Sequence, residues 1–187
     1  MQTQKELVRL HPRHGLLNID VLSFGRLSHR ILEEVGGSRT PVLDDTGKSL
    51  VLQKVAAQKA GELPVLGSFL NRQGYIHEVK SAISEFMQYN ITWEQLEKIT
   101  QKAEISPVLS AKLRDISVMY RAFETFMQGS YITDEEILSV LASMAKDSEI
   151  LSDSVLVFDE FTGFTPVQNQ LMQELLQVTD RILITLT

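Results

Sequence analysis

The chain has 187 residues, of which 43% are hydrophobic and 22% charged, a composition that predicts a packed core rather than disorder. It contains no apolar run approaching 18 residues and no cysteine, which excludes a transmembrane helix, disulfides, iron–sulfur clusters and thiolate zinc sites. The net charge of −6 is uneven, with +2 over residues 1–40 and −8 over the rest. We therefore expect any DNA contact to come from the basic N-terminal part. The polar N-terminus lacks a secretory segment, so we expect a cytoplasmic location.

The first forty residues predict a helix, a strand and a second helix. A helix is expected over residues 2–10, closed by Pro12. The β-rich run Ile19–Phe24 favours a strand. Residues 26–35 have apolar side chains at helical spacing, and Gly36-Gly37 ends that helix.

Every strong hydrophobic period between about Thr40 and Ile150 is helical. Thr92 and Thr133 are each followed three residues later by Gln or Glu, which predicts a capping box at the start of a helix. The helices expected in this region cover residues 49–60, 75–89, a short segment from 92, 107–127, and 133–146.

After Asp153 the pattern returns to strand, helix and strand. Val155–Phe158 is predicted as a buried strand, 166–178 as a helix and 182–186 as a second strand. Such a βαβ unit indicates parallel strands joined by a right-handed crossover. The fold class is therefore α/β, an incomplete parallel sheet of about three strands with a large all-helical insertion.

The most informative motif is the acidic pair Asp159-Glu160, directly after the first strand of this unit. In one interpretation the two carboxylates simply lie in solvent. A functional interpretation is favoured by the apolar strand before them, by the aromatic Phe161 and by Gln168, which lies nine positions after Asp159. In nucleotide-driven motors such a pair places one carboxylate near Mg²⁺ and the next near the attacking water. The sequence resembles the superfamily 1 helicase motif D-E-F-Q-D-x-x-x-x-Q at Asp159, Glu160, Phe161 and Gln168. It departs from that motif at Thr162-Gly163, where the glutamine that senses nucleotide state is missing.

Thr46–Ser49 copies the end of a phosphate-binding P-loop, G-x-x-x-x-G-K-[ST]. The position of the first glycine is Val42, no strand precedes the segment, and Asp44-Asp45 would repel phosphate. The segment instead predicts a capped helix start at Ser49.

The segment from Ser23 to Arg30 is a candidate nucleic-acid contact. Arg26 and Arg30 lie one helical turn apart and could hold a phosphate backbone, and Phe24 could stack on a base. In the alternative interpretation Phe24 and Leu27 belong to the core and both arginines are solvated. Both interpretations remain open at this point.

The run Val21–Leu32, followed by Gly36-Gly37 and Arg39–Leu43, resembles the N-terminal region of the AddB/RexB family, the B-type subunit of the bacterial ATP-dependent helicase/deoxyribonuclease. The resemblance continues in order through nearly the whole chain. Further matching segments are residues 85–89, 112–116, 131–133, 159–168 and 184–187.

This resemblance implies a fragment of a much larger protein with a P-loop-type sheet. Residues 1–39 would be the first part of helicase-like domain 1A, 40–150 a helical insertion like domain 1B, and 151–187 the second part of domain 1A. The family's P-loop would lie upstream, and its second motor domain and nuclease domain downstream.

The resemblance also implies a role in double-strand-break resection and homologous recombination, together with the A-type subunit of the same helicase/nuclease. Asp159 would be the carboxylate on the Mg²⁺ side and Glu160 the base that orients water, although many members have Gly at that position. Ser23, Phe24 and Arg26 would line the single-strand track.

We expect the fragment itself to lack helicase, exonuclease and ATPase activity and to carry no cofactor, ATP and Mg²⁺ being possible in the parent protein. The expected partners are DNA and the A-type subunit, with no membrane contact. An exposed strand at 182–186 predicts an edge-strand homodimer. The alternative function is a helical protein-interaction module that anchors the A-type subunit without contacting DNA.

Overall fold

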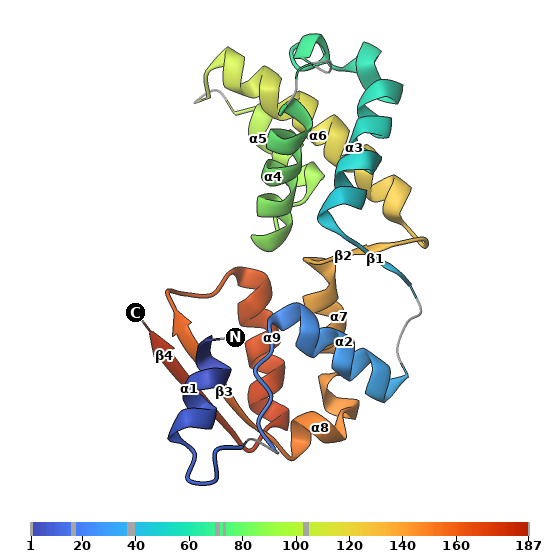
Figure 1. The fold of residues 1–187 in the computed structure, drawn as a ribbon. Helices are drawn as coiled ribbons and strands as arrows, with labels where there is room; N and C mark the ends of the chain where they lie inside the picture. The colour runs from blue at the N-terminus through green and yellow to red at the C-terminus, as the bar shows by residue number, and fades with distance from the viewer. Residues whose placement is uncertain are drawn as a thin grey trace.

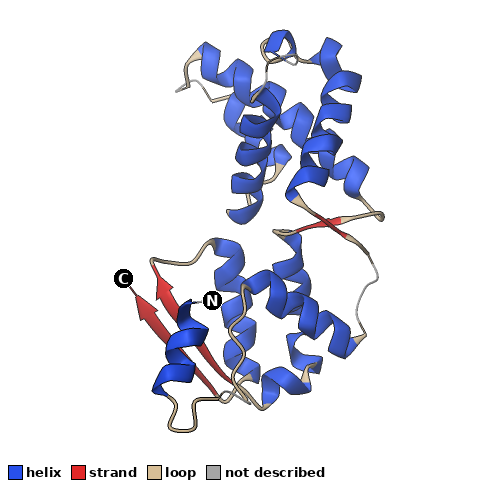
Figure 2. Ribbon diagram, viewed as in Figure 1, coloured by secondary structure: helices blue, strands red, loops and turns tan. Residues whose placement is uncertain are grey.

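The computed structural model describes residues 2–15, 18–36, 40–69, 72, 74–102 and 105–186. The chain folds into two lobes, a helical lobe and an α/β lobe, which a short two-stranded neck connects (Figure 1). The strands occur at the neck and at one edge of the α/β lobe (Figure 2). No helix in the described part of the chain is both long and apolar enough to cross a membrane.

The helical lobe packs four described helices and two short 3₁₀ turns around a core of its own. Its largest fully buried side chains are Leu52, Ile83, Leu96, Met119 and Phe123. The elements are α3 (Asp45–Lys59), η1 (Ala60–Glu62), η2 (Gly67–Phe69), α4 (Tyr75–Gln88), α5 (Trp93–Thr100) and α6 (Pro107–Met127).

The α/β lobe combines the two ends of the chain around a second core. That core includes Ile31, Leu141, Leu151, Phe158, Leu171 and Leu175. The elements are α1 (Gln2–Leu10), α2 (Phe24–Val35), α7 (Glu136–Met144), η3 (Ala145–Asp147), α8 (Glu149–Ser152), β3 (Val155–Phe161), α9 (Pro166–Val178) and β4 (Arg181–Leu186). The strands β3 and β4 are parallel, and α9 connects them, so the predicted βαβ unit is confirmed.

The neck consists of β1 (Val42–Leu43) and β2 (Ile132–Thr133), which pair in parallel. The amide of Ile132 also donates to the carbonyl of Pro41 at 3.1 Å. The helical lobe, residues 44–131, therefore leaves and rejoins the α/β lobe at two adjacent points of the chain.

Most of the helices form where periodicity and capping predicted them. Thr92 and Gln95 exchange the two capping-box hydrogen bonds at the start of α5. The hydroxyl of Thr133 accepts from the Glu136 amide at 3.2 Å while the Glu136 carboxylate accepts from the Thr133 amide at 2.7 Å. The helices predicted at 107–127 and 166–178 have those bounds. Gly36 ends α2 in the left-handed conformation, with φ 73°; Gly37 lies outside the described residues.

Three structural predictions are wrong. Ile19–Phe24 is not a strand, because no described segment pairs with it and Phe24 already begins α2. The helix predicted to start at Ser49 starts at Asp45, because Asp44 accepts from the Gly47 amide at 2.7 Å and caps it. The expected buried strand has one open face, on which Val155 and Val157 are more than half exposed.

The fold is mostly helical, and its described residues form two parallel sheets of two strands each, not the one sheet of about three strands that was predicted, because Ile19–Phe24 is not a strand. This arrangement is compatible with an α/β fold that carries a helical insertion. The helices α7 and α8 follow the neck and pack with α2 and α9, in the core of the α/β lobe.

Candidate functional site

The acidic tip, defined as Asp159 and Glu160, lies in an irregular part of β3. The register advances from Phe158 opposite Ile184 to Phe161 opposite Leu186, so three steps along β3 match two along β4. Glu160 takes up the extra residue with a left-handed backbone, φ 59°. A bulge of this kind turns the side chains at its position away from the regular alternation of a strand.

A single hydroxyl group on β4 holds both residues of the acidic tip. The Thr185 hydroxyl donates to Oδ1 of Asp159 at 2.7 Å and accepts from the amide of Glu160 at 2.9 Å. Both carboxylates are exposed to solvent. The tip is thus an exposed pair of acids whose backbone and one carboxylate oxygen are fixed by the neighbouring strand.

Four phenylalanine rings pack beside the acidic tip. Phe24, from the start of α2, lies with its ring centroid 5.6 Å from that of Phe158 and 5.8 Å from that of Phe161. Phe164 stacks on Phe161 at 5.1 Å. Aromatic pairs at these separations contribute beyond the area that they bury. The ring of Phe24 therefore serves the core, as the alternative interpretation of this residue stated.

The polar residues of the candidate nucleic-acid segment have different surroundings. The Ser23 hydroxyl accepts from the Arg26 amide at 3.4 Å and caps α2. The guanidinium of Arg30 forms an exposed ion pair with Asp20. Within the described residues no ion pair involves Arg26, which is exposed on the first turn of α2. Of the three side chains, Arg26 has the most freedom to bind an anion.

Gln168 forms part of a helix cap. Its side-chain oxygen accepts from the Thr165 amide at 2.9 Å, and its own amide donates to the Thr165 hydroxyl at 3.4 Å. This capping box orients α9 directly after the acidic tip, but it occupies the oxygen of the Gln168 side chain.

The P-loop-like segment at Thr46–Ser49 has no phosphate-binding geometry. The Lys48 ammonium group is buried and lies 2.9 and 2.8 Å from the two oxygens of Glu135. A lysine held in this way cannot also bind a nucleotide phosphate.

The described residues contain no cluster of three or more His, Asp or Glu side chains that could hold a metal ion. The acidic tip supplies two exposed carboxylates, and Oδ1 of Asp159 already accepts from the Thr185 hydroxyl on β4. Mg²⁺ is commonly held by one or two carboxylates, with water and phosphate oxygens completing its octahedral shell. Two carboxylates alone do not complete such a shell, so a Mg²⁺ ion here would need further ligands from outside the acidic tip.

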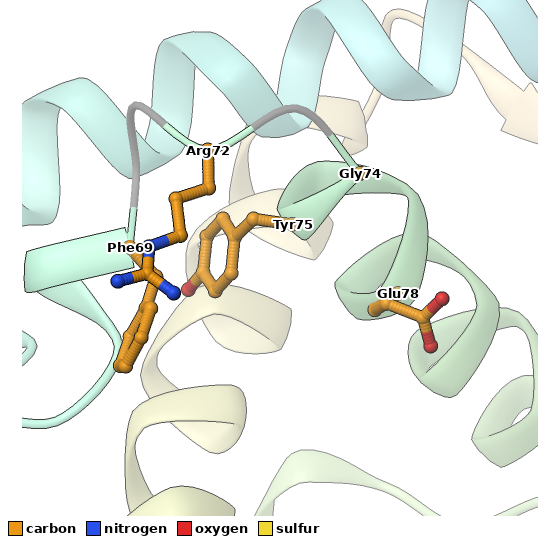
Figure 3. Close-up of a pocket in the computed structure, with 5 residues that line it drawn as sticks. All are labelled: Phe69, Arg72, Gly74, Tyr75 and Glu78. Atoms are coloured by element: carbon orange, nitrogen blue, oxygen red, sulfur yellow. The ribbon is translucent and has the colours of Figure 1, made fainter.

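The helical lobe carries an open pocket of about 350 Å³ far along the chain from the acidic tip. The guanidinium of Arg72 lies 4.7 Å from the ring centroid of Phe69, beside Tyr75, while Glu78 points away from these side chains (Figure 3). Burial, and then the nearby charge of Asp115, raises the pKa of Tyr75 to about 12. The described lining residues do not converge on one point with their polar groups, and the pocket does not extend the acidic site.

Comparison with known protein families shows which family the chain belongs to. A family model described as ADDB, N-terminal, matches residues 1–187, the whole chain. The chain belongs to the AddB N-terminal family. The resemblance seen in the sequence is therefore confirmed.

Several members of the AddB family are similar over at least 90% of this chain. The B-type subunit of the ATP-dependent helicase/deoxyribonuclease of Lachnoclostridium phytofermentans is 44% identical over 187 residues, which is 100% of this chain and 16% of that protein. The corresponding protein of Alkaliphilus metalliredigens is 30% identical over 187 residues, again 100% of this chain and 16% of that protein. The protein of Desulforamulus reducens is 32% identical over 170 residues, 90% of this chain and 15% of that protein. The chain thus spans about 16% of the length of these AddB relatives.

Two features of the site were missed in the sequence. Thr185 gave no local signal, because its role depends on the register between β3 and β4. The capping box at Thr165 and Gln168 did have a signal, since Thr and Gln three residues apart bracket Pro166 at the start of a helix.

Proposed function

We propose that this chain is the N-terminal part of an AddB protein that acts with an A-type subunit in DNA double-strand-break repair by homologous recombination. In this proposal the chain contributes DNA binding and subunit contacts, in the cytoplasm, and has no helicase, exonuclease or ATPase activity of its own. The observation that carries the proposal is the family match over the whole chain. The names of the relatives describe one subunit of a helicase/deoxyribonuclease, which points to DNA and a second subunit as partners.

The acidic tip would serve a nucleotide only within a longer protein. There Asp159 would be the Mg²⁺ ligand and Glu160 the group that orients water, with the phosphates held by residues outside this chain. The Lys48–Glu135 ion pair supports this division of roles, because it removes the lysine of the P-loop-like segment from phosphate binding. DNA-stimulated ATP hydrolysis by the purified chain would contradict the proposal.

Arg26 is the sharpest test of DNA binding. We expect Arg26→Ala to weaken the binding of single-stranded oligonucleotides of any sequence and to reduce the slope of log K against log salt by about 0.7. Fluorescence anisotropy at several salt concentrations measures both quantities. Arg9→Ala is the matched control, because Arg9 is an exposed arginine whose nearest acidic partner is Glu6 on the same helix.

The second candidate function is a helical interaction module that binds the A-type subunit without DNA contact. The separate hydrophobic core of the helical lobe favours it, because such a core lets the lobe present a rigid surface. Retention of the chain on the immobilised A-type subunit, together with no DNA binding at low salt, would support this alternative over the first.

A homodimer through β4 is a further part of the proposal. Within the described residues β4 pairs only with β3, so its other edge is open, and its side chains Leu183 and Leu186 are exposed. Light scattering across a range of concentrations tests this, and a monomer throughout would contradict it.

A further inference from the structure

The two lobes have separate hydrophobic cores. The core of the helical lobe is built from α3 to α6, and the core of the α/β lobe from α2, α7, α9 and β3. Among the described residues, no buried side chain is shared between the two clusters. Each lobe is therefore held together by its own apolar core, while Ile137 and Val167, at the starts of α7 and α9, are buried outside both clusters.

The polypeptide passes from one lobe to the other through the neck. Each neck strand has two residues, and the ladder consists of Val42 opposite Ile132 and Leu43 opposite Thr133. A two-residue ladder can act as a hinge, because large changes in φ and ψ at the ends of short elements produce domain rotation. Between the described helices of the two lobes, α4 also contacts α9.

A buried ion pair joins the two crossings of the neck. Lys48 lies on the first turn of α3, just after β1, and Glu135 lies just before α7, after β2. The Lys48 ammonium group contacts both oxygens of Glu135, and the side chains are only 6% and 8% exposed. Since α7 packs on α2 and α9, Glu135 is anchored in the α/β lobe while Lys48 is anchored in the helical lobe.

The surroundings of Glu135 favour its charged form. Burial raises the pKa of Glu135, but the hydrogen bond and charge of Lys48 outweigh burial and hold the pKa below its usual value, with a further hydrogen bond from Ser84 on α4. Tyr120 on α6 and the neighbouring Glu136 also face this position. A second buried lysine, Lys80 on α4, is already paired with Asp45 and does not compete for Glu135.

We propose that the Lys48–Glu135 ion pair locks the orientation of the helical lobe on the α/β lobe by closing the hinge at the β1–β2 neck. The pair is directional, because two hydrogen bonds from the Lys48 Nζ atom to both Glu135 carboxylate oxygens define the distance and the angle between the two groups. It therefore specifies one arrangement of the lobes, whereas apolar contact at the same place would allow several. The lock sets where the helical lobe stands relative to the acidic tip.

The test uses the distance between the lobes in the chain. The sequence has no cysteine, so Gln53→Cys on α3 and Gln170→Cys on α9, both exposed, place nitroxide labels on one lobe each. Electron–electron double resonance then gives the distribution of distances between the labels. The parent chain is expected to show one narrow distribution.

The decisive variant is Lys48→Met combined with Glu135→Leu. It removes both charges and leaves neither unpaired in the interior, unlike Lys48→Met alone. We expect it to keep its helical circular dichroism and to give a distance distribution roughly twofold broader. Lys59→Met, which removes an exposed ion pair with Glu62 inside the helical lobe, is the matched control and should leave the distribution narrow.

Two results would overturn the proposal. An unchanged narrow distribution in the double variant would mean that other contacts fix the lobes. Loss of helical circular dichroism in the double variant would mean that the pair is needed to fold a lobe rather than to orient it.

Discussion

Replacing Glu160 with glycine should stabilise the chain. The Glu160 backbone is left-handed, with φ 59°, a conformation that costs a non-glycine residue roughly 1–2 kcal/mol. Glycine removes this cost, but it also makes the unfolded chain more flexible, which lowers the stability by about 0.5–1 kcal/mol. The Glu160 side chain is exposed, and the hydrogen bond to Thr185 comes from the backbone amide of Glu160. The substitution therefore removes no contact. The net gain is about 0.5–1 kcal/mol.

Urea denaturation followed by circular dichroism measures this gain as a higher midpoint, and a thermal scan should show a rise of about 2 °C for a chain of this size. Glu160→Ala is the matched control, because alanine keeps the Cβ atom and with it the left-handed cost, so its stability should equal that of the parent chain. If Glu160→Gly were less stable than Glu160→Ala, the backbone of the acidic tip would not be left-handed in solution and the reasoning would be refuted.

The remaining predictions concern three polar contacts. Thr185→Val removes the hydroxyl that holds the acidic tip and should lower the unfolding free energy by about 1 kcal/mol, whereas Thr185→Ser should not; equal losses in urea would contradict this. Asp115→Ala should cost about 3 kcal/mol, because the buried carboxylate accepts from two backbone amides of the loop after η1 at 2.9 and 2.7 Å, and Asp115→Asn should cost clearly less. The folded-state pKa of Glu135 is lowered, so the stability from its pair with Lys48 is present above the unfolded pKa of about 4.3 and is lost as pH falls through the folded pKa. Glu135→Gln should therefore cost about 3 kcal/mol at pH 7 and progressively less below pH 4, and a constant difference across that range would contradict the assignment.

The helices were predictable because their signals are local. Ser106 and Pro107 at the start of α6, and the capping box at Thr92, define helix starts within four residues of sequence. Asp44 shows the limit of such signals, since Asp44 and Ser49 are both acceptable caps, and in the structure it is Asp44 that accepts from the Gly47 amide and begins α3.

Strand formation and the site could be predicted only in part, because both depend on partners distant in sequence. The run Ile19–Phe24 has the composition of a strand, but a strand needs a neighbour, and Phe24 instead packs with Phe158 and Phe161 as the first residue of α2. The predicted strand ended at Phe158 with Asp159 and Glu160 after it, whereas β3 continues to Phe161 and holds both residues in a bulge; the bulge and the Thr185 contact follow from pairing with β4. The roles proposed for Asp159, Glu160 and Arg26 in binding stay predictions.

The parallel pairing of β1 with β2 makes the helical lobe removable in principle. Neighbouring strands lie about 4.8 Å apart, but because these two run in parallel, the chain leaving Leu43 would need a connection of about a dozen residues to reach Ile132. Replacing residues 44–131 with such a connection would leave the α/β core that surrounds the acidic tip unbroken in the chain, because the helical lobe has a hydrophobic core of its own.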